Sequence, residues 1–207
     1  MTNAKLTGKE LSQPPPGPAG KARAGQADTE ERLTEAIELL FFGYRDFISD
    51  PDAILTEYGF GRAHHRVVHF VGRNPAITVA ELLNILRITK QSLARVLREL
   101  IQRGFIEQKT GEKDRRQRHL YLTPAGLDLE RRLAAPQRAR VRRALAAAGP
   151  GAEAAWRRVL LALLDQDQRP EVEHLIAREQ QDARDSDRTR DSDRARGMDK
   201  TGGAGKG

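Results

Sequence analysis

The sequence contains no cysteine, only 5% aromatic residues and no long apolar run. Without cysteine the chain can form neither a disulfide scaffold nor a thiolate metal site, and it cannot sense oxidation through a thiol. No apolar stretch approaches the roughly 18 residues that a membrane-spanning helix needs. The segment 1–20 also lacks the apolar core of a signal peptide. We therefore expect a cytoplasmic protein without a membrane partner.

Positive charge, in contrast, is present in excess and is concentrated in one part of the chain. The 207 residues carry a formal net charge of +7. Residues 28–61 hold 2 Lys and Arg against 9 Asp and Glu, a balance of −7, whereas residues 62–143 hold 19 against 7, a balance of +12. A concentrated basic surface suits contact with a phosphate backbone, although a generic basic surface would give the same count.

Composition and periodicity divide the chain into five segments. Residues 1–27 are rich in Pro, Gly and Ala, and residues 166–207 contain mixed charges and tandem DSDR segments. Both are predicted to be largely disordered tails, with a short weak helix near Val172–Ala177. Between the tails we expect a helical region at 28–61, a winged helix domain at 62–125 and further helices at 126–165.

Two prolines are predicted to interrupt helices. The first helix begins at Asp28 or Thr29, and Asp50-Pro51-Asp52 should break it. Pro136 should kink or interrupt the helix that starts at Thr123-Pro124, because a proline inside a helix removes a hydrogen bond.

A helix-turn-helix is predicted in the basic region. Thr78 and Glu81 form a capping-box pattern before one short helix, and Thr89 is a plausible N-cap for a second helix that runs to Arg103. A tight link joins the two.

A β-hairpin should follow the helix-turn-helix. Residues 105–109 and 118–122 alternate well enough to be two strands, and the loop Thr110–Gln117 between them forms a wing. The predicted fold class is therefore mainly α with a small β-hairpin wing: a winged helix-turn-helix with flanking helices.

The second helix of this motif offers polar side chains for DNA contact if its aliphatic stripe faces the core. The candidates are Thr89, Lys90, Gln91, Ser92 and Arg95. In the major groove Gln can pair with adenine and Arg with guanine. An ordinary solvated helix face is the alternative, and the neighbouring hairpin favours DNA.

The wing offers three arginines, Arg115, Arg116 and Arg118. An arginine at a loop tip can insert into a narrow minor groove, where negative potential is concentrated. Asp114 is expected to orient Arg116, or an arginine of the second helix, through a charge-assisted hydrogen bond. The alternative is a flexible basic loop.

The segment from Ser92 to Gly126 resembles the signature of the MarR family of transcriptional regulators. The matching elements are Ser92-Leu93-Ala94-Arg95, Leu100-Ile101, Gly104-Phe105-Ile106, Asp114-Arg115-Arg116 and Thr123-Pro124-Ala125-Gly126. The likeness covers roughly residues 29–165. Within it, the segment FFGYRDFISDPDAILTEYGFGRAHHRVVHF is similar to the PetP-type subgroup.

This resemblance implies a sequence-specific regulator that binds an inverted-repeat operator in double-stranded DNA as a homodimer. The helices of 28–61 and 126–165 would form the dimer interface; the alternative is that they close a monomer core. The family also implies a small acidic or phenolic effector. Tyr44, Tyr58, His65 and Trp156 could line its pocket.

Three histidines, His64, His65 and His69, form the other cluster. His65 and His69 are spaced to share a helical face and hold a metal. No third ligand is close in sequence, and Arg62 and Arg66 would repel a cation. We therefore expect structural or DNA-proximal histidines, with no metal, no cofactor and no enzymatic activity. The competing functions are a sequence-neutral architectural DNA-binding protein and a metal-dependent hydrolase relying on these histidines.

Overall fold

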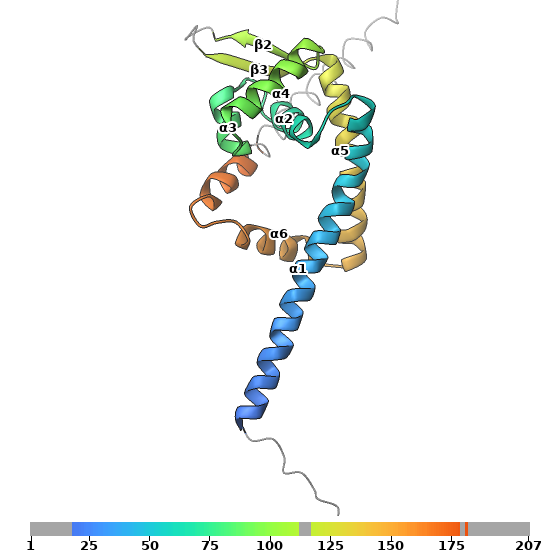
Figure 1. Ribbon diagram of the computed structural model, residues 1–207, viewed down its shortest axis with the longest axis vertical. Coiled ribbons are helices and arrows are strands. Elements are labelled where there is room, and N and C mark those ends of the chain that lie inside the picture. Colours follow the sequence, from blue (N-terminus) through green and yellow to red (C-terminus); the bar gives the residue numbers. More distant parts are fainter. Residues whose placement is uncertain (1–17, 112–116, 179–180, 182–207) are drawn as a thin grey trace, which may run out of the picture. The chain divides into compact units, whose positions relative to one another are not determined.

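The computed structural model describes residues 18–111, 117–178 and 181 (Figure 1). The chain divides into two compact units, Met1–Phe47 and Ile48–Gly207. Helix α1, Pro18–Glu57, begins in the first unit and ends in the second. The second unit also contains α2 (Arg62–Arg73), β1 (Ile77–Thr78), α3 (Val79–Leu86), α4 (Lys90–Gln102), β2 (Ile106–Thr110), β3 (Arg118–Leu122), α5 (Pro124–Ala148) and α6 (Ala152–Ala162). None of the helices in these described ranges could cross a membrane.

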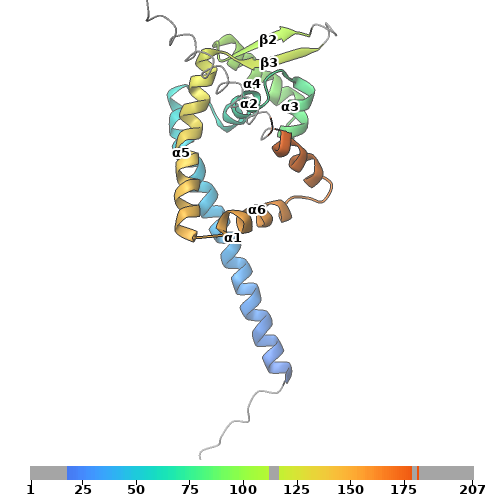
Figure 2. The ribbon, with the colours of Figure 1, turned by 180° about the vertical axis from the view of Figure 1, so that it is seen from behind.

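The winged helix-turn-helix predicted from the sequence is confirmed. Strands β2 and β3 pair in antiparallel fashion from Ile106 opposite Leu122 to Thr110 opposite Arg118. They lie together beside α4, with α3 farther from them, in both views (Figures 1 and 2). A third strand, β1, pairs with β3 and gives the sheet order β1-β3-β2. The sequence did not reveal β1, because two residues are too few to show a periodicity.

Each helix of the motif starts where its capping residue predicts. The Thr78 hydroxyl accepts a hydrogen bond from the Glu81 amide, and the Glu81 carboxylate accepts one from the Thr78 amide. This capping box holds the pKa of Glu81 below its ordinary value, chiefly through the bond from the Thr78 backbone. The Thr89 and Thr123 hydroxyls cap α4 and α5 by accepting hydrogen bonds from the Ser92 and Gly126 amides.

The core lies where α2, α4, α5 and the sheet meet. Helix α2 packs against α3, α4, α5 and β3. The largest fully buried side chains are aliphatic: Leu55, Leu82, Leu93, Leu100, Ile106, Leu120, Leu129, Leu133, Val67, Val68, Val71 and Val96. Burying such side chains is the main favourable contribution to folding, at roughly 1.5–3 kcal/mol for each.

The predicted break at Asp50-Pro51-Asp52 is wrong, and Pro136 does not interrupt its helix, while the kink given as the alternative at Pro136 stays a prediction. Helix α1 runs through Pro51, and α5 runs through Pro136. Pro51 is buried, and ion pairs tie its neighbours Asp50 and Asp52 to arginines of α5 and α2, so tertiary contacts offset the missing hydrogen bond. Because Pro51 has no amide hydrogen, the carbonyl four residues before it has no helical donor. This carbonyl belongs to Phe47, the last residue of the first unit.

The ends of the helical region also differ from the prediction. Helix α1 begins at Pro18 rather than near residue 28, with proline at a helix start, where it is tolerated. At the other end, residues 169–178 are helical, which confirms the short helix predicted near 172–177 within the C-terminal segment and lengthens it. The predictions for 1–17 and 182–207 concern segments outside the described residues.

Candidate nucleic-acid interface

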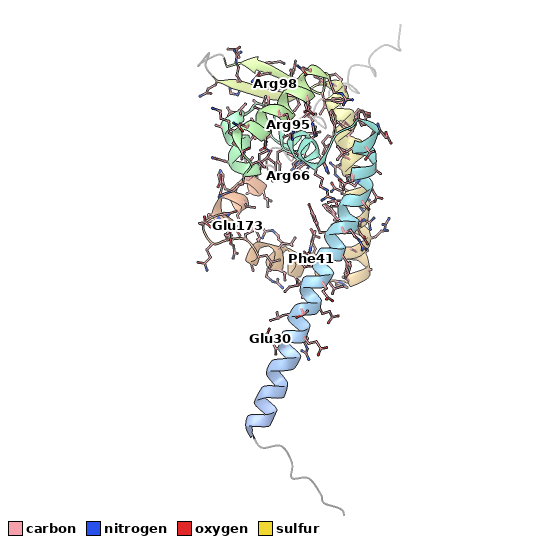
Figure 3. All side chains as sticks on the ribbon, in the orientation of Figure 1. Glu30, Phe41, Arg66, Arg95, Arg98 and Glu173 are labelled. Atoms are coloured by element: carbon pink, nitrogen blue, oxygen red, sulfur yellow. The ribbon has the colours of Figure 1, made fainter. Side chains whose placement is uncertain are left out.

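Helix α4 has one buried face and one exposed polar face. Its aliphatic stripe, Leu93, Val96, Leu97 and Leu100, is buried, as the sequence predicts. At 100° per residue, Gln91, Arg95 and Arg98 then fall within a narrow arc on the opposite side. Arg95 and Arg98 both project from α4 (Figure 3). The helix therefore presents one amide and two guanidinium groups along a single line.

This exposed face is not occupied by contacts within the protein. Within the described parts of the chain, the side chains of Lys90, Gln91, Arg95 and Arg98 have no hydrogen-bond or ion-pair partner, and all four are exposed. Ala94 lies between them and adds almost no bulk. Unpaired donors on a firmly packed helix can bind the acceptors of a base edge without first breaking internal bonds.

Two of the predicted contact residues, Thr89 and Ser92, form hydrogen bonds within the protein. Thr89 caps α4, and its hydroxyl also donates to the Ser92 hydroxyl oxygen at 2.9 Å. Their exposed side chains can still reach a phosphate, since helix N-termini bind anions. Arg98 was missed by the sequence analysis, although its spacing from Gln91 and Arg95 is the i, i+7 and i, i+3 of one helical face.

The turn between α3 and α4 is fixed from the side of α2. The Arg66 guanidinium donates to the Leu86 carbonyl oxygen at 2.7 Å, which places a cation at the C-terminus of α3. Arg87 follows in the left-handed region, with φ 48°, and its amide closes the helix by donating to Leu83. These contacts fix the angle at which α4 leaves the turn.

At the wing, the structure describes the base of the hairpin and not its tip. Asp114, Arg115 and Arg116 lie outside the described residues. Arg118 is exposed at the base, and its guanidinium donates to the Thr110 hydroxyl oxygen across the hairpin at 2.6 Å. Lys109 is engaged on β2: its ammonium group lies 2.7 Å from the Glu107 carboxylate, whose hydrogen bond raises the pKa of Lys109.

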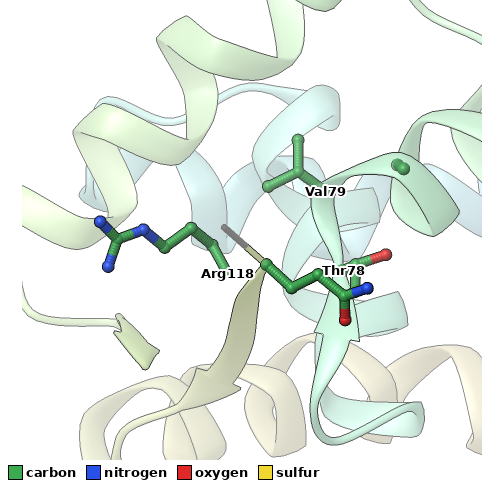
Figure 4. Close-up of a pocket in the computed structure, with 5 residues that line it drawn as sticks. Thr78, Val79 and Arg118 are labelled. Atoms are coloured by element: carbon green, nitrogen blue, oxygen red, sulfur yellow. The ribbon is translucent and has the colours of Figure 1, made fainter. Parts of the chain in front are cut away.

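A small pocket lies where the wing meets the start of α3. Its lining residues are Thr78, Val79, Ala80, Gln117 and Arg118 (Figure 4). No pattern in the sequence predicts this pocket, because β1 and β3 bring together segments about forty residues apart only through the sheet register.

The predicted effector residues occupy different surroundings. Tyr44 is exposed in the first unit, and Trp156 is exposed on α6. The Tyr58 ring packs against Phe60 and Phe105, and its hydroxyl oxygen accepts a hydrogen bond from Arg132. The half-buried His65 has a lowered pKa, first because of burial and then because of the nearby His69. An effector pocket formed by these residues stays a prediction.

The other two histidines of the cluster, His64 and His69, each lie beside a single carboxylate. His64 is buried, and its Nε2 lies 2.8 Å from the Glu99 carboxylate of α4. His69 lies 3.7 Å from Glu130, and its proximity is the largest cause of the lowered pKa of this carboxyl. In the described residues, no three His, Asp or Glu side chains gather as a metal ion would require.

Comparison with known proteins gives consistent matches. The family model described as "MarR family" matches residues 58–117. The HTH-type transcriptional regulator PetP of Rhodobacter capsulatus is 51% identical over 141 residues, which cover 68% of this chain and 85% of that protein.

Solved structures of similar fold include the MarR family transcription regulator SP03579 and Streptococcus pneumoniae FabT in complex with DNA. The first is 20% identical, with a TM-score of 0.58, over 67% of this chain and 92% of that one. The second is 22% identical, with a TM-score of 0.54, over 65% of this chain and 94% of that one. At these identities the likeness concerns the fold.

Proposed function

The chain belongs to the MarR family of DNA-binding transcriptional regulators, and from this premise we propose that it binds an inverted-repeat operator as a homodimer, with α4 in the major groove. The observation that carries the proposal is the exposed line of Gln91, Arg95 and Arg98 on a helix whose other face is packed into the core. In the FabT complex, a protein of this fold is bound to DNA, which supports the same use here.

Within this proposal the contact residues divide into three roles: base reading, phosphate binding and insertion into the minor groove. Gln91 and Arg95 read base edges, and Arg98 extends the same line. Lys90, Thr89 and Ser92 bind phosphate at the start of α4. Arg118 binds the backbone from the base of the wing, while Arg115 and Arg116 enter the minor groove. Asp114 orients Arg116 or an arginine of α4 through a charge-assisted hydrogen bond.

Selection of bound fragments from a random DNA pool tests sequence specificity. An inverted repeat with half-sites about one helical turn apart is the expected result. Failure to enrich any sequence would instead support the sequence-neutral architectural protein. Salt dependence alone does not separate the two functions, because both bind phosphates.

The dimer is supported by exposed apolar side chains on the helices that flank the winged core. On α1 these are Leu33, Ile37, Leu39, Leu40, Phe41, Phe42 and Tyr44; on α5 and α6 they are Leu127, Trp156, Val159 and Leu160, followed by Leu163. Large exposed apolar patches mark interaction sites. Dimerisation of the 28–61 and 126–165 helices would cover these side chains, and two-fold symmetry would place two copies of α4 on the two half-sites.

We further propose that a small acidic or phenolic effector modulates binding, with Tyr58 and His65 among its contacts. A panel of aromatic carboxylates, added to the full chain in a thermal unfolding assay, tests this directly. A ligand present at one hundred times its Kd should stabilise the protein by about 2.7 kcal/mol. The effector is excluded for this panel if none of its members shifts Tm. Our proposal has the regulator acting in the cytoplasm, without enzymatic activity.

A further inference from the structure

The C-terminal helix at 169–178 contacts the helix-turn-helix at two turns. The Arg178 guanidinium donates to the Asn74 side-chain oxygen at 2.8 Å, in the turn between α2 and β1. The Glu171 carboxylate lies 3.7 Å from the Arg87 guanidinium, in the turn between α3 and α4. The two contacts therefore flank the segment that contains β1 and α3, one before β1 and one at the C-terminus of α3.

These contacts share one face of the C-terminal helix. Residues 171 and 178 are seven positions apart, which places them two turns apart on the same side. Between them lie the partly buried apolar side chains of Val172, Leu175 and Ile176, whereas His174 and Ala177 are exposed. A short helix with its polar contacts and its apolar side chains on one face is suited to pack against another part of the protein.

The helix is also stabilised locally. The Asp165 carbonyl accepts hydrogen bonds from the amides of Gln168 and Arg169, and its carboxylate accepts one from the Gln168 side chain. Arg169 and Glu173 form an i, i+4 ion pair at 3.3 Å. This second pair stays within the helix, so it supports helix formation without contacting the helix-turn-helix.

The turn that receives Arg178 combines a buried asparagine with an alanine in an unfavourable backbone conformation. Asn74 is only 6% exposed, and Ala76 adopts φ 70°, which is uncommon for a residue with a side chain. His119 and Leu120 of β3 bond to the backbone of Ala76. Arg178 also lies close enough to Glu81, at the start of α3, to lower its pKa further. The C-terminal helix thus adds contacts where the backbone conformation is least favourable.

The docked helix leaves the candidate DNA-binding face open. It lies on the side of α3 away from β2 and β3 in both views, while Arg95 and Arg98 project from α4 (Figures 1, 2 and 3). Residues 163–168 join it directly to α6, the helix that carries exposed Trp156 and Val159.

We propose that residues 169–178 form a clasp that joins the proposed dimerisation helix α6 to the helix-turn-helix and fixes α3 for DNA binding. The clasp is a function of this chain's own C-terminal segment, and its role in operator binding rests on the function proposed above. Release of the clasp would loosen the turns at Asn74 and Arg87, and α4 would then be held less firmly when it enters the groove.

The experiment compares two double variants of the full chain. The clasp variant carries Glu171→Ala and Arg178→Ala; the control carries Arg169→Ala and Glu173→Ala and so removes the same charges from the same helix. Amide hydrogen exchange without DNA reports on docking. We expect faster exchange at 74–81 and 84–90 in the clasp variant and wild-type exchange there in the control. Equal exchange in wild type and clasp variant would overturn the docking.

Affinity for one duplex, measured at fixed salt, reports on the consequence of docking. The clasp variant should bind about threefold to tenfold more weakly than the control. Faster exchange with unchanged affinity would overturn the role in DNA binding while leaving the docking in place. Any duplex that the wild type binds can be used, so failure to find an inverted-repeat operator would reject the proposed specificity and not the clasp. The double variant Arg87→Glu with Glu171→Arg exchanges the two charges of the Arg87–Glu171 ion pair. Because the pair can still form, amide exchange at 84–90 should stay at the wild-type rate.

Discussion

At the scale of single residues, His64 shows how one buried ring positions α4, the helix proposed to enter the major groove. Its Nδ1 accepts a hydrogen bond from the Gly61 amide at 3.1 Å, at the start of α2, so this nitrogen carries no proton. The proton therefore lies on Nε2, which donates to the Glu99 carboxylate of α4. The ring also stacks on Phe60 at 4.5 Å. His64 thus caps one helix and holds another.

Replacement of His64 should accordingly destabilise the fold more than replacement of its partner. We expect His64→Ala to lower the free energy of unfolding by roughly 1–3 kcal/mol, because it leaves the Gly61 amide and Glu99 without this partner and removes a packed ring. Glu99→Gln keeps an acceptor for Nε2 and should cost less. Urea denaturation of both variants measures the difference, and equal losses would contradict the role assigned to the ring.

Arg95 allows a sharper test of base reading. Arg95→Ala should cost roughly 1–3 kcal/mol of operator affinity and relax the preference at one base pair. Arg131→Ala is the matched control, since Arg131 is also exposed but pairs with Asp128 on α5. Binding of both variants is measured on operator and on random duplex. An equal loss for Arg95→Ala on the two duplexes would remove it from base reading.

Arg98, the member of this face that the sequence analysis missed, should behave similarly to Arg95. If it reads a base, Arg98→Ala lowers operator affinity more than random-duplex affinity; if it binds phosphate, both fall together and the salt slope decreases by about one. Titration of operator binding against salt distinguishes the two contacts. Unchanged affinity for both duplexes would place Arg98 outside the interface.

His65 predicts how stability depends on pH. Burial and the charge of His69 lower its folded-state pKa below the ordinary 6.5, against the opposing effect of Asp52 and Glu130. The unfolded chain therefore takes up a proton first as the pH falls, and stability decreases below about 6.5. The lowered pKa of Glu130 acts in the same direction, but only as the pH falls through its ordinary value of 4.5.

Urea denaturation at pH 7.5, 6.5 and 5.5 isolates the histidine contribution, because the carboxylates stay ionised over this range. His65→Gln should flatten the decrease that the wild type shows between the two lower values. His174→Gln, on an exposed ring, should retain the wild-type profile. If His65→Gln kept the full decrease, the pH dependence would have to come from another group.

At the scale of elements, the close approach of α5 to the start of the wing explains the glycine that ends the Thr-Pro-Ala-Gly sequence. A Cβ at Gly126 would lie 2.0 Å from the Phe105 carbonyl oxygen, a backbone atom that cannot move aside freely. That carbonyl also accepts the Thr123 amide at 3.1 Å, and the Thr123 hydroxyl donates to the Gly104 carbonyl. The turn before β2 and the first turn of α5 are thus locked together.

Gly126→Ala should therefore separate α5 from the wing. We expect a loss of more than about 2 kcal/mol in the free energy of unfolding, the usual consequence of overpacking against fixed atoms. Gly61→Ala serves as the control, because no atom lies within 4 Å of the added Cβ and the φ of −118° suits any residue. Thermal unfolding compares the two. A Tm equal to that of the control would show that the contact can relax.

Local signals in the sequence predicted the helix-turn-helix well and the long helices poorly. Thr78, Thr89 and Thr123 each fixed a helix start, because a capping hydrogen bond involves residues only three apart. The helix continues through a buried Pro51, whose neighbours Asp50 and Asp52 pair with Arg140 and Arg62, and no local pattern indicates these contacts. Strand β1 likewise exists only because β3 is present to pair with it.

At the scale of the whole molecule, part of the positive surplus is used inside the protein. The acidic end of α1 pairs with the basic region: Asp50 with Arg140 at 3.1 Å, Asp52 with Arg62 at 2.8 Å and Glu57 with Arg132 at 2.8 Å. The balance of +12 over 62–143 therefore overstates the charge that faces DNA. A count along the sequence cannot separate paired arginines from unpaired ones such as Arg95, whereas the structure can.

Operator binding by two linked copies of α4 requires the dimer, and α6 provides the position at which to break it. Val159 and Leu163 are 58% and 62% exposed and lie one helical turn apart, on the stripe that includes Trp156. Val159→Glu with Leu163→Glu would bury repelling charges if two copies met along this stripe. Ala154→Glu, on the opposite side of α6, adds a charge at an exposed position and is the control.

We expect the double variant to be a monomer in size-exclusion chromatography with light scattering and the control to remain a dimer. Because the second half-site is then no longer bound within the same complex, operator affinity should fall by about a hundredfold or more. Affinity for a duplex with a single half-site should change little, since each copy keeps its own α4. A double variant that remained dimeric would place the interface elsewhere, and a monomer with full operator affinity would show that one copy suffices to bind the operator.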